Sequence, residues 1–135
     1  MPFDWREFIE LGKGLIAEGT QVQLNESKLR SAVSRLYYGS FCYTRNYMEQ
    51  EYNYSYIRSE EHSVHKDLQE YLKKLWKSHL CLVADRLRDL QEWREECDYD
   101  DDLSLSLLKD EAQISEQLAQ FIISQIENDR EIRRR

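Results

Sequence analysis

The stretch that decides the fold is ESKLRSAVSRLYYGSFCYTRNYME, residues 26–49. Its apolar side chains recur at steps of three and four over several turns. They are Leu29, Ala32, Val33, Leu36, Tyr37, Phe41, Thr44, Tyr47 and Met48. One face of an α-helix has this period, whereas a β-strand repeats every two residues. Asn25 suits the N-cap position, so we predict a long amphipathic helix over residues 26–49 that buries one face.

Four further segments show the helical period: residues 5–18, 59–77, 80–96 and 106–129. Ser59 is the expected N-cap of the second of these. Residues 51–57 carry Tyr52, Tyr54 and Tyr56 at period two, and we predict a loop there with its tyrosines on the surface. One proline and four glycines are too few for the frequent turns of a β-sandwich or β-barrel. The fold is therefore predicted to be all-α, a four- to five-helix up-and-down bundle.

The length and charge of the chain suggest a simple organisation. With 135 residues, we expect a single helical domain over residues 1–129 and a basic C-terminal tail over residues 130–135. The tail carries +3 while the whole chain carries −7, and it either contacts phosphate or is solvated; the second is favoured. No apolar run approaches the ~20 residues of a membrane span, and no signal-peptide pattern is present. We expect a soluble, cytoplasmic protein with no membrane association.

Several classes of chemistry find no support in the sequence. Cys42, Cys81 and Cys97 form no Cys-x-x-Cys motif, so buried reduced thiols are expected. His62 and His65 can share one helix face, but no Glu-x-x-His pairing completes a metal site, and we expect neither metal nor cofactor. A histidine here can still act as a general acid or base. There is no Gly-x-Ser-x-Gly elbow and no glycine-rich phosphate loop after a strand.

Arg94 interrupts the apolar pattern of residues 80–96. The inward positions step through Leu80, Val83, Leu87 and Leu90, and the next step falls on Arg94. An arginine keeps its proton, so its guanidinium must be paired or reach water. One interpretation is a structural salt bridge, or a buried stem with a solvated head. The other is a fixed cation aimed at a phosphate in a cleft.

A second ordered row runs beside the apolar stripe of residues 26–49. Arg35, Tyr38, Cys42 and Arg45 follow at steps of three, four and three, so they share one edge of the helix. Two arginines flanking a tyrosine can bind an anionic partner through charge and stacking. The alternative is an amphipathic rim of the bundle that faces acidic side chains.

Two segments resemble the signature motifs of HEPN domains, which are small helical bundles common in prokaryotes. Residues 29–41, LRSAVSRLYYGSF, are similar to the family pattern R-x-A-[IV]-S-R-x-Y-Y-[AG]-x-F. Residues 90–99, LQEWREECDY, resemble the pattern L-x-x-x-R-x-x-A-D-Y, with Cys97 in place of the small residue. The resemblance covers nearly the whole chain. It implies a helical bundle that usually dimerises.

The resemblance also implies a function. Many HEPN proteins are metal-independent ribonucleases of toxin–antitoxin or defence systems, with an arginine and a following histidine contributed by both subunits of a homodimer. Arg94 matches the arginine, but residues 99–101 are Tyr-Asp-Asp, so the histidine is absent. Tyr99 or His62 would then assist Arg94, Asp98 would orient it, and Arg35, Tyr38 and Arg45 would bind RNA or phosphate. The alternative is a non-catalytic HEPN module that binds a nucleotide or a partner such as a nucleotidyltransferase, an antitoxin or an effector subunit.

Overall fold

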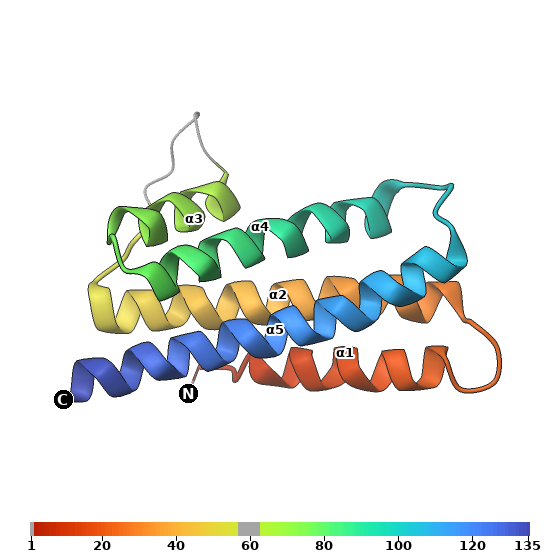
Figure 1. Ribbon diagram of the computed structural model, residues 1–135, viewed down its shortest axis with the longest axis horizontal. Helices are drawn as coiled ribbons and strands as arrows, with labels where there is room; N and C mark the ends of the chain where they lie inside the picture. Colours follow the sequence, from red (N-terminus) through yellow and green to blue (C-terminus); the bar gives the residue numbers. More distant parts are fainter. Residues whose placement is uncertain (1, 57–62) are drawn as a thin grey trace.

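The computed structural model describes residues 2–56 and 63–135, and in these two ranges it contains helices but no strands. The helices are α1 (Arg6–Gly19), α2 (Glu26–Tyr52), α3 (Val64–Lys74), α4 (Ser78–Tyr99) and α5 (Leu105–Arg134). The predicted all-α class is thus confirmed. Figure 1 shows that α1, α2, α4 and α5 are long helices that alternate in direction, while the short α3 lies beside the start of α4.

Helix α2 is the centre of the bundle, because it packs against α1, α4 and α5. Its predicted stripe is buried, with Leu29, Leu36, Tyr37 and Met48 wholly inaccessible to water. Each such side chain contributes about 1.5–3 kcal/mol through burial. The Asn25 side chain accepts a hydrogen bond from the backbone N–H of Lys28, so the predicted N-cap is confirmed.

Two glycines allow α1 and α2 to approach each other closely. A Cβ atom added to Gly39 of α2 would lie 2.9 Å from Ile9 Cγ1 and 3.0 Å from the backbone oxygen of Trp5. A Cβ atom added to Gly12 of α1 would lie 2.7 Å from Leu36 Cγ. Each helix therefore presents a glycine where the side chain or backbone of the other fills the space that a Cβ would need.

Helix α5 extends further than the sequence pattern predicted. It ends at Arg134, so residues 130–134 are its last turns, and residues 131–135 are exposed to solvent. The extension is held by Arg133, whose guanidinium carbon lies 4.1 Å from the centroid of the Tyr52 ring. Arg133 Nη2 also donates a hydrogen bond to the backbone oxygen of Glu51 at 2.7 Å. Contacts with α2 therefore stabilise a segment whose own charges repel one another.

The connection from α2 to α3 also corrects an expectation. Tyr54 is not on the surface but is 5% exposed, and its hydroxyl donates to Asp67 Oδ2 at 2.6 Å. Helix α3 begins at Val64 with Ser63 as its N-cap, and the expected cap Ser59 lies outside the described residues. The alternation of tyrosines indicated a non-helical segment, but it carried no information on which ring faces the core.

A tight turn joins α3 to α4. Trp76 occupies the left-handed region with φ of 57°, which a bulky side chain rarely adopts. The turn contains neither glycine nor proline, and the strained residue reverses the chain between the two helices. As a result α3 lies back along α4, and its buried Leu68 and Leu72 join the core.

Candidate functional site

Arg94 lies inside the bundle, as the break in the apolar pattern indicated. It is 8% exposed, on the face of α4 that also buries Leu90 and Cys97. Its Nη1 atom donates a hydrogen bond to Asp98 Oδ2 at 3.2 Å, and its Nη2 atom lies 3.6 Å from Glu95 Oε1. The cation is therefore paired within its own helix, by carboxylates at positions one and four residues further on.

Two tyrosines of α2 enclose the Arg94 guanidinium. Its central carbon lies 5.6 Å from the ring centroid of Tyr37 and 5.4 Å from that of Tyr38. Aromatic faces attract a cation, and more strongly where water is excluded. The Nε atom of Arg94 is buried and has no hydrogen-bond partner in the part of the chain that the structure describes. A buried donor without an acceptor is costly, so the guanidinium retains unused capacity for an anion.

His65 of α3 lies against the same pair of tyrosines. Its Nδ1 atom is 2.5 Å from the Tyr37 hydroxyl, and its ring centroid is 6.3 Å from that of Tyr38. Burial raises the pKa of Tyr37 far above its ordinary value, so Tyr37 keeps its proton, and the tautomer of His65 decides which of the two groups donates the hydrogen bond. Burial, and then the positive charge of Arg94, lower the pKa of His65. The neutral imidazole of His65 and the permanently charged guanidinium of Arg94 thus contact the same two tyrosine rings.

The other predicted site residues lie at varying distances from this cluster. Tyr99 is 78% exposed at the end of α4. Arg45 donates hydrogen bonds to Asn46 and lies 3.9 Å from Glu49, so these polar contacts stay within α2. Asp98 and Tyr38 both contact Arg94, as described above. His62 falls outside the residues that the structure describes.

Arg35 lines a groove of about 660 Å³ between α1, α2 and the end of α4. The lining residues are Leu11, Leu15, Ser27, Arg30, Ser31, Ser34, Arg35, Cys97 and Asp98. The Arg35 guanidinium lies over the Phe8 ring at 5.0 Å. Within residues 2–56 and 63–135 it has no carboxylate within 4.0 Å, so its charge is available. Asp98 lines the groove and also pairs with Arg94, and it connects the two features.

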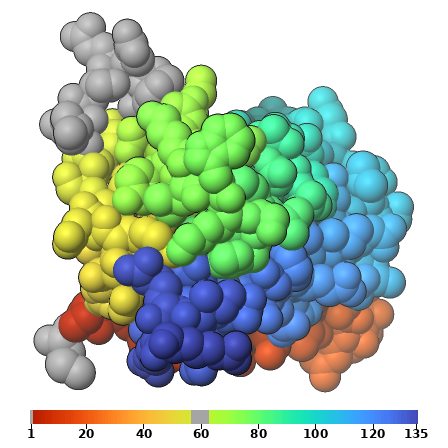
Figure 2. All heavy atoms as spheres, turned by 60° about the vertical axis from the view of Figure 1, so that its left-hand side comes forward, coloured from red at the N-terminus to blue at the C-terminus, as the bar shows by residue number. Residues whose placement is uncertain are grey.

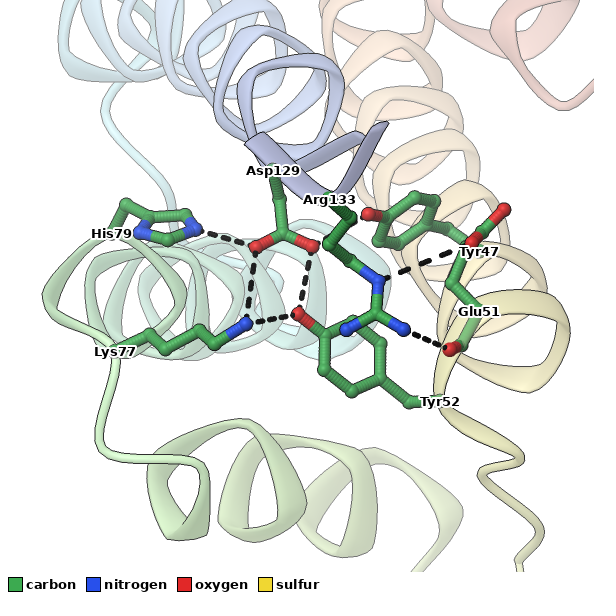
Figure 3. A network of polar contacts seen from close by, with 7 residues as sticks. All are labelled: Tyr47, Glu51, Tyr52, Lys77, His79, Asp129 and Arg133. Atoms are coloured by element: carbon green, nitrogen blue, oxygen red, sulfur yellow. Dashed lines mark hydrogen bonds and ion pairs between the residues drawn. The ribbon is translucent and has the colours of Figure 1, made fainter. Parts of the chain in front are cut away.

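A second polar network surrounds Asp129, at the end of the bundle where α2 ends and α4 begins (Figure 3). Asp129 is wholly buried, and its carboxylate accepts hydrogen bonds from Tyr47 at 2.5 Å, Tyr52 at 2.8 Å and His79 at 2.7 Å. Lys77 Nζ lies 4.0 Å away. Burial alone would raise the pKa of Asp129, but the hydrogen bonds from Tyr47, His79 and Tyr52 outweigh it and hold the pKa below its ordinary value.

Sequence reasoning missed His65 and Asp129 for different reasons. His62 and His65 are three residues apart, and only the start of α3 at Val64 shows that His65 faces α2. Asp129 carried the same signal as Arg94, because it follows Ile122 and Ile126 on a buried stripe at steps of four and three. A charge on a core stripe indicates a buried polar network in both cases.

The chain matches no family model, no curated protein and no solved structure. None of the described helices has a stretch long and apolar enough to cross a lipid bilayer. In the two described ranges, no group of three or more histidine, cysteine or carboxylate side chains is placed to hold a metal ion. The arrangement of the side chains themselves is therefore the basis for assigning a function.

Proposed function

We propose that the chain is a HEPN-type component of a prokaryotic toxin–antitoxin or defence system, and that it cleaves RNA without a metal ion. The observation that supports the proposal is that Arg94 and His65 both pack against the rings of Tyr37 and Tyr38. Cleavage by the ribose 2′-hydroxyl needs a base for the hydroxyl proton and a cation for the charge that develops on the phosphate. The cluster offers one group of each kind.

The reaction can be written with these groups alone. In the tautomer that carries its hydrogen on Nδ1, the Nε2 atom of His65 accepts the proton of the 2′-hydroxyl, and the 2′-oxygen attacks the phosphorus. The bond from phosphorus to the 5′-oxygen breaks, and the protonated imidazole returns a proton to the leaving oxygen. The products are a 2′,3′-cyclic phosphate and a 5′-hydroxyl. The lowered pKa of His65 leaves the imidazole neutral at pH 7, which is the form that a general base requires.

Arg94 would bind the scissile phosphate and stabilise the transition state. Its Nε atom lacks a described acceptor but is buried, so a phosphate oxygen would reach it only after the side chain moves. Asp98 orients the guanidinium through the 3.2 Å hydrogen bond to Nη1, because it lies one helical turn further along α4. In this tautomer of His65, Nδ1–H donates to the Tyr37 oxygen 2.5 Å away, which holds the ring and leaves Nε2 as the basic nitrogen.

The proposal places the RNA in the groove, whose lining includes Asp98, the hydrogen-bond partner of Arg94. Arg35 contributes a charge that no described carboxylate neutralises, and the hydroxyls of Ser31 and Ser34 lie beside it in the lining. The proposal includes a homodimer, in which the Arg94 clusters of the two copies face a common crevice. The dimer rests on the HEPN resemblance of residues 29–41 and 90–99, where Arg94 is the matched arginine.

The test is RNA digestion in the presence of EDTA by wild type and by Arg94→Ala. Removing a charge that stabilises the transition state lowers the rate by about 10²–10³-fold. Arg88→Ala is the matched control, because Arg88 is exposed on the same helix. Circular dichroism and a thermal melt verify that both variants fold. Undiminished cleavage by a folded Arg94→Ala variant would end the catalytic proposal.

The second candidate function is a HEPN module without catalysis that binds a nucleotide or a protein partner. It is favoured by the pairing of Arg94 with Asp98 and Glu95, which already balances the cation within its own helix. In this case wild type leaves RNA intact, with or without EDTA. The product of an adjacent gene, such as a nucleotidyltransferase, an antitoxin or an effector subunit, then co-purifies with the chain in fixed stoichiometry. Cleavage that depends on Arg94 contradicts this candidate.

A further inference from the structure

Trp76 is the most conspicuous exposed aromatic residue of the protein. It is 90% exposed in the turn between α3 and α4, whereas Leu68, Leu72 and Leu80 on either side of it are wholly buried. Its backbone lies in the left-handed region, and that region is unfavourable for a bulky residue. Trp76 thus combines backbone strain with an apolar ring in water, and no described part of the chain offsets either cost. A flat ring held outward in this way can stack on a planar ligand.

Cations surround Trp76 in the turn. Residues 73–79, KKLWKSH, contain three lysines and no acidic residue, whereas the whole chain carries −7. Lys73 is paired with Asp85 at 3.1 Å. Lys74 is exposed and has no carboxylate within 4.0 Å among residues 2–56 and 63–135. The turn is therefore positively charged around its tryptophan.

The last turns of α5 extend this positive surface. Tyr52 joins the two segments, because Lys77 Nζ lies 5.1 Å and the Arg133 guanidinium carbon 4.1 Å from the centroid of its ring. The view in Figure 2 shows the C-terminal turns of α5 below the green surface of α3 and the start of α4, on one face of the molecule. Arg134 is exposed and, like Lys74, has no described carboxylate within 4.0 Å. We define the basic-aromatic end as Lys74, Trp76, Lys77, Arg133 and Arg134. Lys77 lies 4.0 Å from Asp129 and Arg133 lies 4.0 Å from Glu51, so Lys74 and Arg134 supply the charge that no described carboxylate balances.

We infer that the basic-aromatic end binds single-stranded RNA, with a base stacked on Trp76 and phosphates bound by the lysines and arginines. Single-strand binding sites combine an aromatic platform with a positively charged track, and this end has both. The choice of RNA rests on the proposed function, whereas the choice of a single strand rests on the exposed ring. In duplex RNA the bases are stacked on one another and offer no free face to Trp76.

An anionic membrane is the main competing occupant, and the structure favours RNA over it. A helix that binds a membrane surface presents a continuous apolar face to the lipid. In α3, Leu68 and Leu72 are completely buried and Val64 and Tyr71 are partly buried against the core, so the surface offers one exposed ring rather than an apolar face. One tryptophan among lysines and arginines fits a base flanked by phosphates better than an acyl layer.

The basic-aromatic end is distinct from the Arg94 cluster. Arg94 lies sixteen residues beyond the start of α4, which follows the turn directly. At 1.5 Å per residue the separation along the helix axis is roughly 24 Å. A strand that occupies both places must span several nucleotides. We therefore expect the end to hold RNA that flanks the cleavage position and to contribute to affinity rather than to the chemical step.

The experiment measures binding apart from cleavage. A fluorescein-labelled, fully 2′-O-methylated 20-nucleotide single strand is titrated with protein, and the dissociation constant is read from fluorescence anisotropy. The 2′-O-methyl groups remove the attacking hydroxyls, so the probe stays intact. Trp76→Ala is expected to raise the dissociation constant on the order of tenfold, and Trp76→Phe to restore most of the affinity because it keeps a stacking face.

A control variant and two outcomes test whether Trp76 itself binds the RNA. Val22→Ala is the matched control, because Val22 is 94% exposed and lies in the connection between α1 and α2, at the opposite end of the bundle. Reversing the charges in Lys74→Glu with Arg134→Glu should weaken binding and reduce its salt dependence. Equal affinities for wild type, Trp76→Ala and Val22→Ala overturn the inference. Binding to phosphatidylserine vesicles with none to the oligonucleotide overturns it too, in favour of a membrane.

The outcomes also separate this inference from the proposed function. If Trp76→Ala weakens binding while wild type never cleaves RNA, the proposed ribonuclease is wrong and the binding surface stands. If wild type cleaves RNA and Trp76→Ala binds and cleaves equally well, the surface is wrong and the ribonuclease stands.

Discussion

Replacing Gly39 by alanine tests the close crossing of α1 and α2. The new Cβ atom would lie 2.9 Å from Ile9 Cγ1, 3.0 Å from the Trp5 backbone oxygen and 3.1 Å from Phe8 Cβ. The oxygen of Trp5 cannot easily move, because it accepts the hydrogen bond from the Phe8 N–H that opens α1. Overpacking of this kind costs about 1–3 kcal/mol.

The same substitution carries an opposing gain. Alanine is favoured over glycine within a helix by about 0.5–1 kcal/mol. The free energy of unfolding should therefore fall, by up to about 2.5 kcal/mol, which is the largest difference between the two effects. Gly14→Ala isolates the gain, because a Cβ atom there meets nothing within 4 Å. That variant should be more stable than wild type by about 0.5–1 kcal/mol.

Urea unfolding followed by circular dichroism measures both variants under the same conditions. The decisive quantity is the sign of each change, since the two substitutions are chemically identical and both lie within helices. If Gly39→Ala stabilises the protein as much as Gly14→Ala does, the crossing is looser than described and the reasoning is refuted.

Three further predictions concern buried ionisable groups. Arg94→Gln should raise the pKa of His65, because it removes a nearby positive charge; an imidazole titration by NMR that does not move would contradict their proximity. The lowered pKa of Asp129 stabilises the fold above the unfolded value of about 4 and is lost as the pH falls through the folded value. Asp129→Asn should therefore reduce stability at pH 7 by about 1–3 kcal/mol and flatten the acid limb of a urea-midpoint profile; an unchanged profile argues against the network. Burial raises the pKa of Cys97 to about 12, so a thiol reagent should label half-exposed Cys81 in the native protein and Cys97 only after unfolding, as read by mass spectrometry.

The helical period predicted most of the fold because each long helix buries one stripe. For α2 it predicted both the start at Glu26 and the Asn25 cap. It placed the end of α5 too early, because residues 130–134 lack apolar side chains at the expected steps apart from Ile132. Their helix depends on Arg133 contacting Tyr52, a residue far away in the sequence. The apolar period indicates which side chains a helix buries, but it does not predict a cation such as Arg133 packing on the distant ring of Tyr52.

The candidate site was partly predictable for the same reason. A charge on a core stripe identified Arg94, and the row on α2 included Tyr38, which contacts it. His65 was not identified as the imidazole of the cluster, because its direction depends on where α3 begins. The groove beside Arg35 depends on the crossing of α1 over α2, which no single helix pattern contains.

The network around Asp129 affects the order in which segments of the protein fold and unfold. Its hydrogen bonds join residues 82, 77 and 50 positions apart in the chain, to Tyr47, Tyr52 and His79. Contacts between such distant segments form late in folding, since the intervening loops must close first. Once formed, they hold a stretch of helix that would otherwise fray. Backbone amides near Asp129 should thus exchange with deuterium as slowly as those of the central helix, and the three segments should lose protection together.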